Sequence, residues 1–145
     1  ILIDYAVTPD AIDNILTTVR EFAPARLVFL FGCGGDRDKG KRPIMGRIGG
    51  ELADLCILTS DNPRTEDPME ILREIEEGIK ETTGEYVVIE NRRDAIRHAL
   101  EIGREGDIIV LCGKGHETYQ ETMGVKRPFD EKVVVQELLT ELRGE

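Results

Sequence analysis

The chain has 145 residues, of which 40% are hydrophobic and 33% are charged, and its formal net charge at pH 7 is −10. This composition is typical of one folded domain, and the acidic balance argues against nucleic acid as a partner, because nucleic-acid binders usually carry a basic face. No apolar run approaches the ~18 residues of a membrane helix and no secretory leader is recognisable, so we expect no membrane association and a cytoplasmic location.

Apolar runs alternate with helical periodicity along the whole chain. The predicted strands cover residues 1–4, 26–31, 55–59, 86–89 and 107–112. The predicted helices run from Pro9 to Phe22, over 44–53, from Pro68 to Ile79, over 93–103, and from beyond Asp130 to Leu142. Thr8 is a suitable N-cap for the first helix, because Pro9 then takes the first helical position, where its missing N–H is no loss. The apolar run 26–31, between Pro24 and Gly32, favours a strand buried on both faces.

This alternation predicts a Rossmann-like, three-layer α/β domain with a mostly parallel sheet of about six strands. Residues 118–122 and 125–128 are expected to form a small hairpin around Gly124. Four polar loops each follow a predicted strand, and they cover residues 4–10, 32–37, 60–64 and 113–117. Ligands of open α/β sheets bind at the carboxyl edge of the strands, so we expect these loops to form one site.

The loop over residues 32–42 combines glycines with cations. Five basic residues lie within eleven positions, namely Arg37, Lys39, Lys41, Arg42 and Arg47. Glycine-rich turns let backbone N–H groups approach an anion, which favours a local anion site over the alternative of a solvated, charged turn. Gly35 to Lys41 imitates a phosphate-binding P-loop, but Arg42 follows instead of the serine or threonine that holds magnesium, so we reject that interpretation.

Two further loops carry groups suited to an amino acid. Arg64 offers a planar fork of donors for a carboxylate, and Asp61 could hold an ammonium group. Asn62 could bond either group and Pro63 fixes the backbone, although an ordinary Asn-Pro turn with a surface arginine is the alternative.

The loop over residues 113–117 supplies a glycine pair, Glu117 as an ammonium acceptor, and His116. No serine or cysteine nucleophile is evident beside His116, so we expect it to be a structural or hydrogen-bonding residue.

The three cysteines are widely spaced and form no C-x-x-C pair, so buried free thiols are the expected state of Cys33, Cys56 and Cys112. The chain has two histidines, and we expect no metal site in it.

Three motifs resemble those of a known family. GCGGDRDKGKRPIMG (32–46), DNPR (61–64) and GKGHETYQ (113–120) look like the C-terminal domain of the Mur ligases, and most closely the MurE type. DYAVTPD (4–10) and FDEKV (129–133) fit the same family, so the resemblance covers essentially the whole chain.

The resemblance implies an ATP-dependent ligase of the bacterial cytoplasm that adds meso-diaminopimelate to UDP-MurNAc-L-Ala-D-Glu in peptidoglycan synthesis. In that family ATP, assisted by Mg²⁺, phosphorylates the D-glutamate carboxylate, the incoming amine attacks the acyl phosphate, and phosphate leaves. The P-loop and the nucleotide-sugar pocket belong to the central and N-terminal domains, which we expect to be absent from these 145 residues. The chain alone, as one C-terminal domain over 1–145, is therefore expected to be inert.

The resemblance also implies roles for individual residues. The diaminopimelate positions of the family correspond to Arg37, Asp61, Asn62, Pro63, Arg64, Gly113 and Glu117. Arg64 would hold the carboxylate at the far, D-configured centre, Glu117 and the Gly113 backbone would hold its ammonium, and Arg37 would steer the other carboxylate. Asp36 corresponds to an acidic residue that contacts the ATP ribose.

The chain departs from the family pattern at three positions. Val7 replaces a histidine that lies close to the nucleotide in the family, which puts the ATP contact there in doubt but not the amino-acid site. Glu131 and Lys132 stand where the family tends to have aspartate and arginine, and the resemblance assigns them no role.

Other functional classes remain as alternatives. A dehydrogenase domain would need G-x-G-x-x-G after the first strand, and the sequence there is Tyr5-Ala6-Val7-Thr8. A non-catalytic module that senses an amino acid or nucleotide would bind its ligand tightly on its own. A relative of folylpolyglutamate synthetase is disfavoured by the DNPR and GKGHE segments.

Overall fold

The computed structural model describes residues 1–4, 8–23, 25–35, 37–113 and 119–143. The strands are β1 (Leu2–Ile3), β2 (Leu27–Phe31), β3 (Leu55–Leu58), β4 (Glu85–Val88), β5 (Ile108–Leu111), β6 (Tyr119–Thr122) and β7 (Val125–Pro128). The helices are α1 (Pro9–Phe22), α2 (Lys41–Leu52), α3 (Pro68–Ile79), α4 (Arg92–Ile102) and α5 (Glu131–Leu142). Of the helices within the described ranges, none is long and apolar enough to cross a bilayer.

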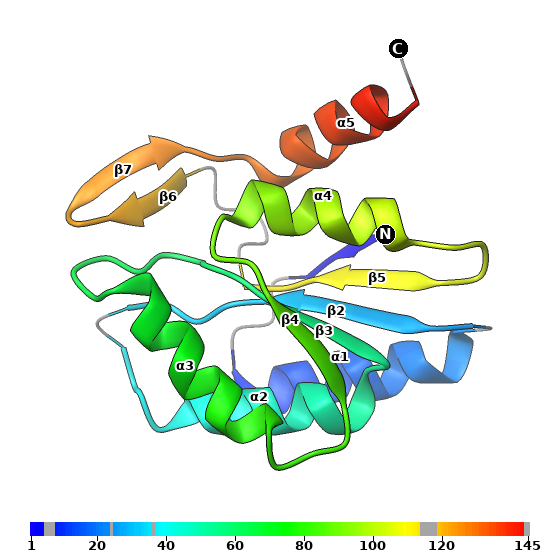
Figure 1. The fold of residues 1–145 in the computed structure, drawn as a ribbon, viewed down its shortest axis with the longest axis horizontal. Coiled ribbons are helices and arrows are strands. Elements are labelled where there is room, and N and C mark those ends of the chain that lie inside the picture. The colour runs from blue at the N-terminus through cyan, green and yellow to red at the C-terminus, as the bar shows by residue number, and fades with distance from the viewer. Residues whose placement is uncertain (5–7, 24, 36, 114–118, 144–145) are drawn as a thin grey trace.

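The main sheet has five strands in the order β1-β5-β2-β3-β4, and all of its pairings are parallel (Figure 1). The parallel α/β prediction is confirmed, with five strands in place of about six. The reason is that β6 and β7 pair with each other in a separate antiparallel hairpin. Gly124, with φ of +78°, takes the left-handed conformation that lets the chain reverse there.

Helices cover both faces of the sheet, with α1, α2 and α3 on one side and α4 and α5 on the other (Figure 1). The central strand β2 is fully buried, as predicted. Phe29 and Phe31 stack with ring centroids 4.4 Å apart and pack into the core under α1–α3, whereas Val28 and Leu30 pack into the core under α4 and α5. One strand thus contributes to two cores.

The helix starts follow the sequence signals. The hydroxyl of Thr8 accepts a hydrogen bond from the Ala11 N–H at 3.2 Å, and Pro9 begins α1, which confirms the predicted cap. Helix α2 begins at Lys41, three residues earlier than predicted. Pro43 is tolerated there because it lies within the first turn, where the N–H groups have no helical acceptor.

The order of the strands creates a switch point. From β2 the chain moves outward to β3 and β4, and it then crosses over the sheet through α4 to reach β5 on the other side of β2 (Figure 1). In open α/β sheets the loops diverge where the order reverses, and a crevice opens at the carboxyl ends of those strands. The switch point here lies between the ends of β2 and β5.

An ion pair joins the start of β2 to the start of β5 at the opposite, amino edge of the sheet. The Asp107 carboxylate is 2% exposed and accepts hydrogen bonds from Arg26 Nη2 at 2.7 Å and Nε at 3.2 Å. It also accepts from the backbone N–H groups of Arg26 and Arg104 at 3.0 and 2.9 Å. These donors, the Arg26 guanidinium above all, lower the pKa of Asp107 to about 2 despite the opposing effect of burial.

We expect Asp107→Asn to lower the free energy of unfolding at pH 7, because the charged carboxylate is favoured in the folded state. The folded-state pKa is below the ordinary value, so this stabilisation is fully present above about pH 4 and is lost as the pH falls through about 2. Urea unfolding between pH 2 and 7 should show the gap between wild type and variant shrinking at the acid end. The exposed α1 substitution Asp13→Asn is the control, and an Asp107→Asn gap that stays constant down to pH 2 would contradict the prediction.

Candidate functional site

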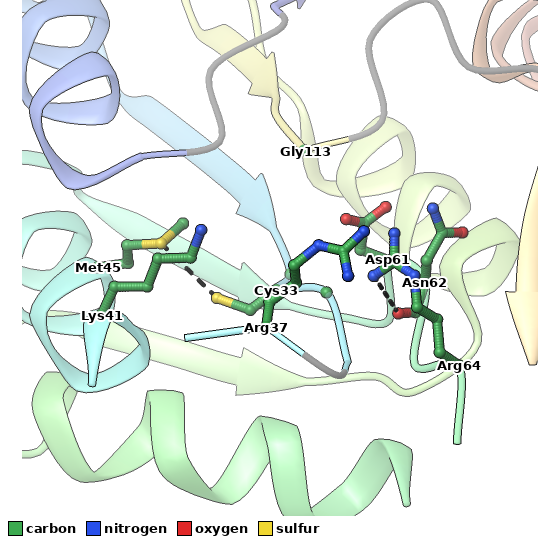
Figure 2. A pocket seen from close by; sticks show the side chains of 10 residues that line it. Cys33, Arg37, Lys41, Met45, Asp61, Asn62, Arg64 and Gly113 are labelled. Carbon is green, nitrogen blue, oxygen red and sulfur yellow. Dashed lines mark hydrogen bonds between the residues drawn. The ribbon is translucent and has the colours of Figure 1, made fainter. Parts of the chain in front are cut away.

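A cavity of about 160 Å³ lies at the switch point, where β2, β3 and β5 end (Figure 2). Three loops and the first turns of α2 supply its walls. The described residues that line it are Gly32, Cys33, Gly34, Arg37, Lys41, Met45, Asp61, Asn62, Arg64 and Gly113. The predicted convergence of separate loops at the carboxyl edge is therefore observed for the loops after β2, β3 and β5.

The cavity brings together five of the residues proposed from the sequence, which are Arg37, Asp61, Asn62, Arg64 and Gly113. Pro63 instead lines a neighbouring hollow of about 480 Å³, on the side of the loop that faces α4 and β6. The remaining proposals, for Asp36, Glu117, His116 and Val7, fall on positions outside the described residues.

The glycines after β2 allow two loops to touch through their backbones. The Gly35 N–H donates to the Asn62 carbonyl at 2.7 Å. A Cβ atom at Gly35 would lie 1.8 Å from the Pro63 carbonyl oxygen, and one at Gly34 would lie 2.7 Å from Arg64 Nη1. These glycines therefore serve close packing of the loop over residues 61–64, in addition to any role in binding an anion.

Arg64 is held in a strained conformation beside the cavity. Its φ of 52° lies in the left-handed region, which costs a residue with a side chain about 1–2 kcal/mol. The β6–β7 hairpin fixes it, since the Arg64 N–H donates to the Glu121 carbonyl at 3.0 Å and the Arg64 carbonyl accepts from the Met123 N–H. The guanidinium donates through Nη1 to the Gly35 carbonyl at 2.9 Å, and Nε lies 3.7 Å from the Glu121 carboxylate. Non-glycine strain of this kind is concentrated at functional sites.

The hairpin also anchors the two residues before Pro63. Asn62 is 1% exposed, and its Oδ1 accepts a hydrogen bond from the Glu121 N–H at 2.9 Å. The Gln120 side chain donates to the Asp61 carbonyl at 2.8 Å. No pattern in the sequence indicates this docking. The Asn62 side-chain oxygen Oδ1 therefore serves the scaffold in this structure.

The positive patch expected over residues 37–47 needs correction. Arg42 is fully buried and binds both oxygens of Glu66, at 2.7 and 3.1 Å, while its Nη1 lies 2.7 Å from the Glu74 carboxylate. Its Nη2 also donates to the Gly34 carbonyl at 3.0 Å. Acidic residues from the α3 side neutralise this arginine, so it ties the loop after β2 to the segment after Pro63 and does not enter the cavity wall.

Arg37 and Lys41 are the two cations of that patch which line the cavity (Figure 2). Lys39 lies 3.6 Å from Glu66, and Arg47 forms an exposed ion pair with Glu81. The sequence places Lys41 in the basic patch but not at a position for the amino acid, because the predicted helix begins only at residue 44. Helix α2 begins at Lys41, which places Lys41 and Met45 one turn apart on the same face.

One wall of the cavity is apolar and unreactive. Cys33 Sγ lies 3.7 Å from Met45 Sδ (Figure 2). Burial raises the pKa of the Cys33 thiol to about 12, so it is protonated at neutral pH and is not a nucleophile. Cys56 and Cys112 are also free and buried, as predicted, and burial raises the pKa of both thiols to about 12.

The charges of the cavity suit binding rather than acid–base chemistry. Among its described lining residues, Arg37, Lys41 and Arg64 are cationic and Asp61 is a carboxylate. Gly113 adopts φ of +100°, and a Cβ atom there would lie 3.8 Å from the Asp61 carboxylate. The arrangement can therefore hold carboxylates at its cations, an ammonium at Asp61 and an apolar segment against Cys33 and Met45.

The profile of the family described as "Mur ligase, glutamate ligase domain" matches residues 1–115. The chain belongs to this family. The resemblance seen in the motifs is thereby confirmed at the level of the family.

Two curated relatives of this Mur ligase domain carry the name UDP-N-acetylmuramoyl-L-alanyl-D-glutamate–2,6-diaminopimelate ligase. That of Caldanaerobacter subterraneus subsp. tengcongensis is 56% identical over 141 residues, and that of Clostridium botulinum is 54% identical over 142 residues. The alignments cover 97% and 98% of this chain but 29% of each relative. The chain thus spans less than a third of the length of these relatives.

Two solved structures share the fold of this chain. A structure of UDP-N-acetylmuramoyl-L-alanyl-D-glutamate–2,6-diaminopimelate ligase matches with a TM-score of 0.92 and 45% identity, over 97% of this chain and 29% of that one. A murein peptide ligase Mpl from Psychrobacter arcticus matches with a TM-score of 0.64 at 19% identity, over 96% of this chain and 26% of that one, and shares the fold alone.

We expect Gly35→Ala to destabilise the Mur ligase domain by about 1–3 kcal/mol, the usual cost of an added methylene group in a packed site. The new Cβ would overlap the Pro63 carbonyl and push the two loops apart. Gly40→Ala is the matched control, because its Cβ would meet only Asp38 Oδ1 at 3.2 Å, and its effect should stay below about 0.5 kcal/mol. Equal urea-unfolding midpoints for the two variants would show that the loops are not in close contact.

Proposed function

We propose that this chain is the amino-acid-binding domain of an ATP-dependent ligase that adds meso-diaminopimelate to UDP-MurNAc-L-Ala-D-Glu in the bacterial cytoplasm. The observation that carries the proposal is the single cavity in which Arg37, Asp61, Asn62, Arg64 and Gly113 meet. The high identity to diaminopimelate ligases over 97% of the chain supports it and disfavours a folylpolyglutamate synthetase.

The cavity matches the chemistry of the proposed ligand. Diaminopimelate carries an amino-acid group at each end of a short methylene chain. Arg64 and Asp61 lie at one side of the cavity, Lys41 and Met45 lie at the other, and Arg37 lies between them (Figure 2). Arg64 would hold the far carboxylate, Asp61 would accept the far ammonium, and Arg37 would steer the second carboxylate. The apolar wall at Met45 and Cys33 would contact the methylene groups.

ATP and Mg²⁺ belong, in this proposal, mainly to parts of the ligase beyond these 145 residues. Mg²⁺ prefers several oxygen ligands, and Asp61 is the one carboxylate among the described lining residues, beside three cations. This donor set does not fit a magnesium ion.

When bound, ATP supplies the phosphoryl group that activates the acceptor carboxylate, with Asp36 as the proposed ribose contact. The residues of this chain bind and orient the incoming amine, and Glu117 remains a proposed ammonium acceptor.

The full-length ligase should strongly discriminate against lysine. Lysine lacks the carboxylate at its far end, so in a partly buried site the Arg64 guanidinium would have no ligand carboxylate to bind. Sites that bond a group which the analogue lacks reject the analogue by roughly 10⁴–10⁵ in kcat/KM. Competition between the two amino acids in a ligation assay measures the ratio. Comparable turnover of lysine and meso-diaminopimelate would refute the proposed function.

Arg64→Ala should raise the KM for diaminopimelate far more than the KM for ATP. Loss of one partner of a desolvated, hydrogen-bonded charge pair costs about 2–5 kcal/mol, so the diaminopimelate KM should rise at least ~30-fold. Arg73→Ala is the matched control, since Arg73 is an exposed arginine of α3 that pairs with Glu70. A rise confined to the ATP KM would exclude Arg64 from the amino-acid site.

A further inference from the structure

A second buried arginine, Arg92, joins three separate segments beside the proposed site. Arg92 is the first residue of α4 and its side chain is fully buried. Its Nη1 donates to the Ser60 carbonyl at 3.2 Å and its Nη2 donates to the Cys112 carbonyl at 2.9 Å. Nε and Nη2 donate to the two carboxylate oxygens of Glu131, each at 3.0 Å. All of its donor nitrogens are therefore engaged.

The two carbonyls lie just after two strands that are not paired with each other. Ser60 follows β3 and Cys112 follows β5, and these strands flank β2 in the sheet. Each pairs with β2, and the two ladders end where the Thr59 N–H donates to the Phe31 carbonyl at 3.0 Å and the Cys112 N–H donates to the Leu30 carbonyl at 2.9 Å. Beyond that point the loops leave the sheet, and the Arg92 guanidinium joins the Ser60 and Cys112 carbonyls.

The residues next in the chain line the cavity. Asp61 follows Ser60 and Gly113 follows Cys112. Arg92 therefore holds the backbone one residue before Asp61 and one residue before Gly113. In the proposed ligase these two residues lie at the ammonium of the far centre.

Glu131 makes the bridge possible. A buried guanidinium without a counter-charge is strongly unfavourable, and Glu131, which is fully buried, supplies that charge in a two-point contact. Glu131 is the first residue of α5, where the helix dipole also favours a carboxylate. Buried ion pairs are no better for stability than well-packed apolar pairs, so the position of this pair, rather than its energy, indicates its use.

We infer that Arg92 and Glu131 form a positioning pair for the amino-acid site, and that the start of α5 is thereby coupled to the cavity. This inference rests on the proposed function. It gives a role to Glu131, to which the family resemblance assigned none. Neither residue touches the cavity ligand in this proposal, so their effect acts through Asp61 and Gly113.

The opposite edge of the sheet supplies a matched control. The Arg26 guanidinium binds the Asp107 carboxylate through Nε and Nη2 and also donates to the Ile102 carbonyl at 2.8 Å. The contacts resemble those of Arg92, with a buried carboxylate and a backbone carbonyl, although the Arg26 side chain is 32% exposed and binds one carbonyl in place of two. The pair lies at the amino edge, across the sheet from the cavity. If both arginines were purely structural, substitution of either would lower stability without a selective change in the diaminopimelate KM.

The test compares Arg92→Lys with Arg26→Lys in the full-length ligase. Lysine keeps the charge but lacks the fork that binds Glu131 and both carbonyls together. We expect Arg92→Lys to raise the diaminopimelate KM at least ~10-fold with the ATP KM within about twofold, whereas Arg26→Lys should change neither KM by more than about twofold even where it lowers the melting temperature. Similar KM effects of the two variants, or none from Arg92→Lys, would overturn the inference.

Amide hydrogen exchange on the 145-residue chain gives a readout without turnover. Arg92→Lys should speed exchange in segments 59–63 and 112–113 relative to Arg26→Lys. Glu131→Asp, which keeps the carboxylate, should show a smaller change in the same segments and replaces Arg92→Lys should that variant not fold. In the unmodified ligase, diaminopimelate should slow exchange at the start of α5, and an unchanged α5 would count against the coupling.

Failure of the proposed function is distinguishable from failure of the positioning pair. An unmodified ligase that does not use diaminopimelate would refute the proposed function alone, because exchange in the two cavity segments still tests the pair. An active ligase whose Arg92→Lys and Arg26→Lys variants behave alike would refute the pair alone.

Discussion

The structure depends on how three parallel strands are held together beyond the point where their ladders end. Parallel strands share hydrogen bonds only while they run side by side, and the loops that bind a ligand must leave that arrangement. Two buried arginines replace the lost bonds. Arg42 joins the Gly34 carbonyl to Glu66, and Arg92 joins the Ser60 and Cys112 carbonyls. A guanidinium suits this task because its fork of donors can bind a carbonyl and a carboxylate at once.

The same pairs decide the charge of the cavity. The protein is acidic overall, with a net charge of −10. The buried arginines are neutralised by Glu66, Glu74 and Glu131, so they add no net charge to the cavity. The described wall of the cavity nevertheless carries more cations than carboxylates. A positive recess in an acidic surface attracts anionic groups locally, without making the whole protein a binder of polyanions.

Local signals in the sequence predicted the elements and the edge of the sheet at which the site lies. The Thr8–Pro9 helix start, the apolar strand β2 and the hairpin turn at Gly124 depend on residues close together in the chain, and the structure has all three. The clustering of the three loops also followed, because a parallel sheet brings the carboxyl ends of its strands to one edge. The partners of Arg42 and Arg92 could not be predicted in this way. From the sequence alone each arginine looks like an exposed surface residue, and only the tertiary fold brings a glutamate beside it.

The hairpin shows the same limit and explains how Arg64 is held in place beside the cavity. Glu121 and Asn62 are 59 positions apart, and no periodicity links them, yet their contact fixes the loop. A left-handed Arg64 would relax in a free loop, because the strain of about 1–2 kcal/mol exceeds thermal energy. The backbone bonds to Glu121 and Met123 prevent this relaxation and keep the guanidinium beside the cavity before any ligand arrives. A side chain held in advance loses little conformational freedom on binding, so in the proposed ligase more of the contact between Arg64 and a carboxylate would be available to separate diaminopimelate from lysine.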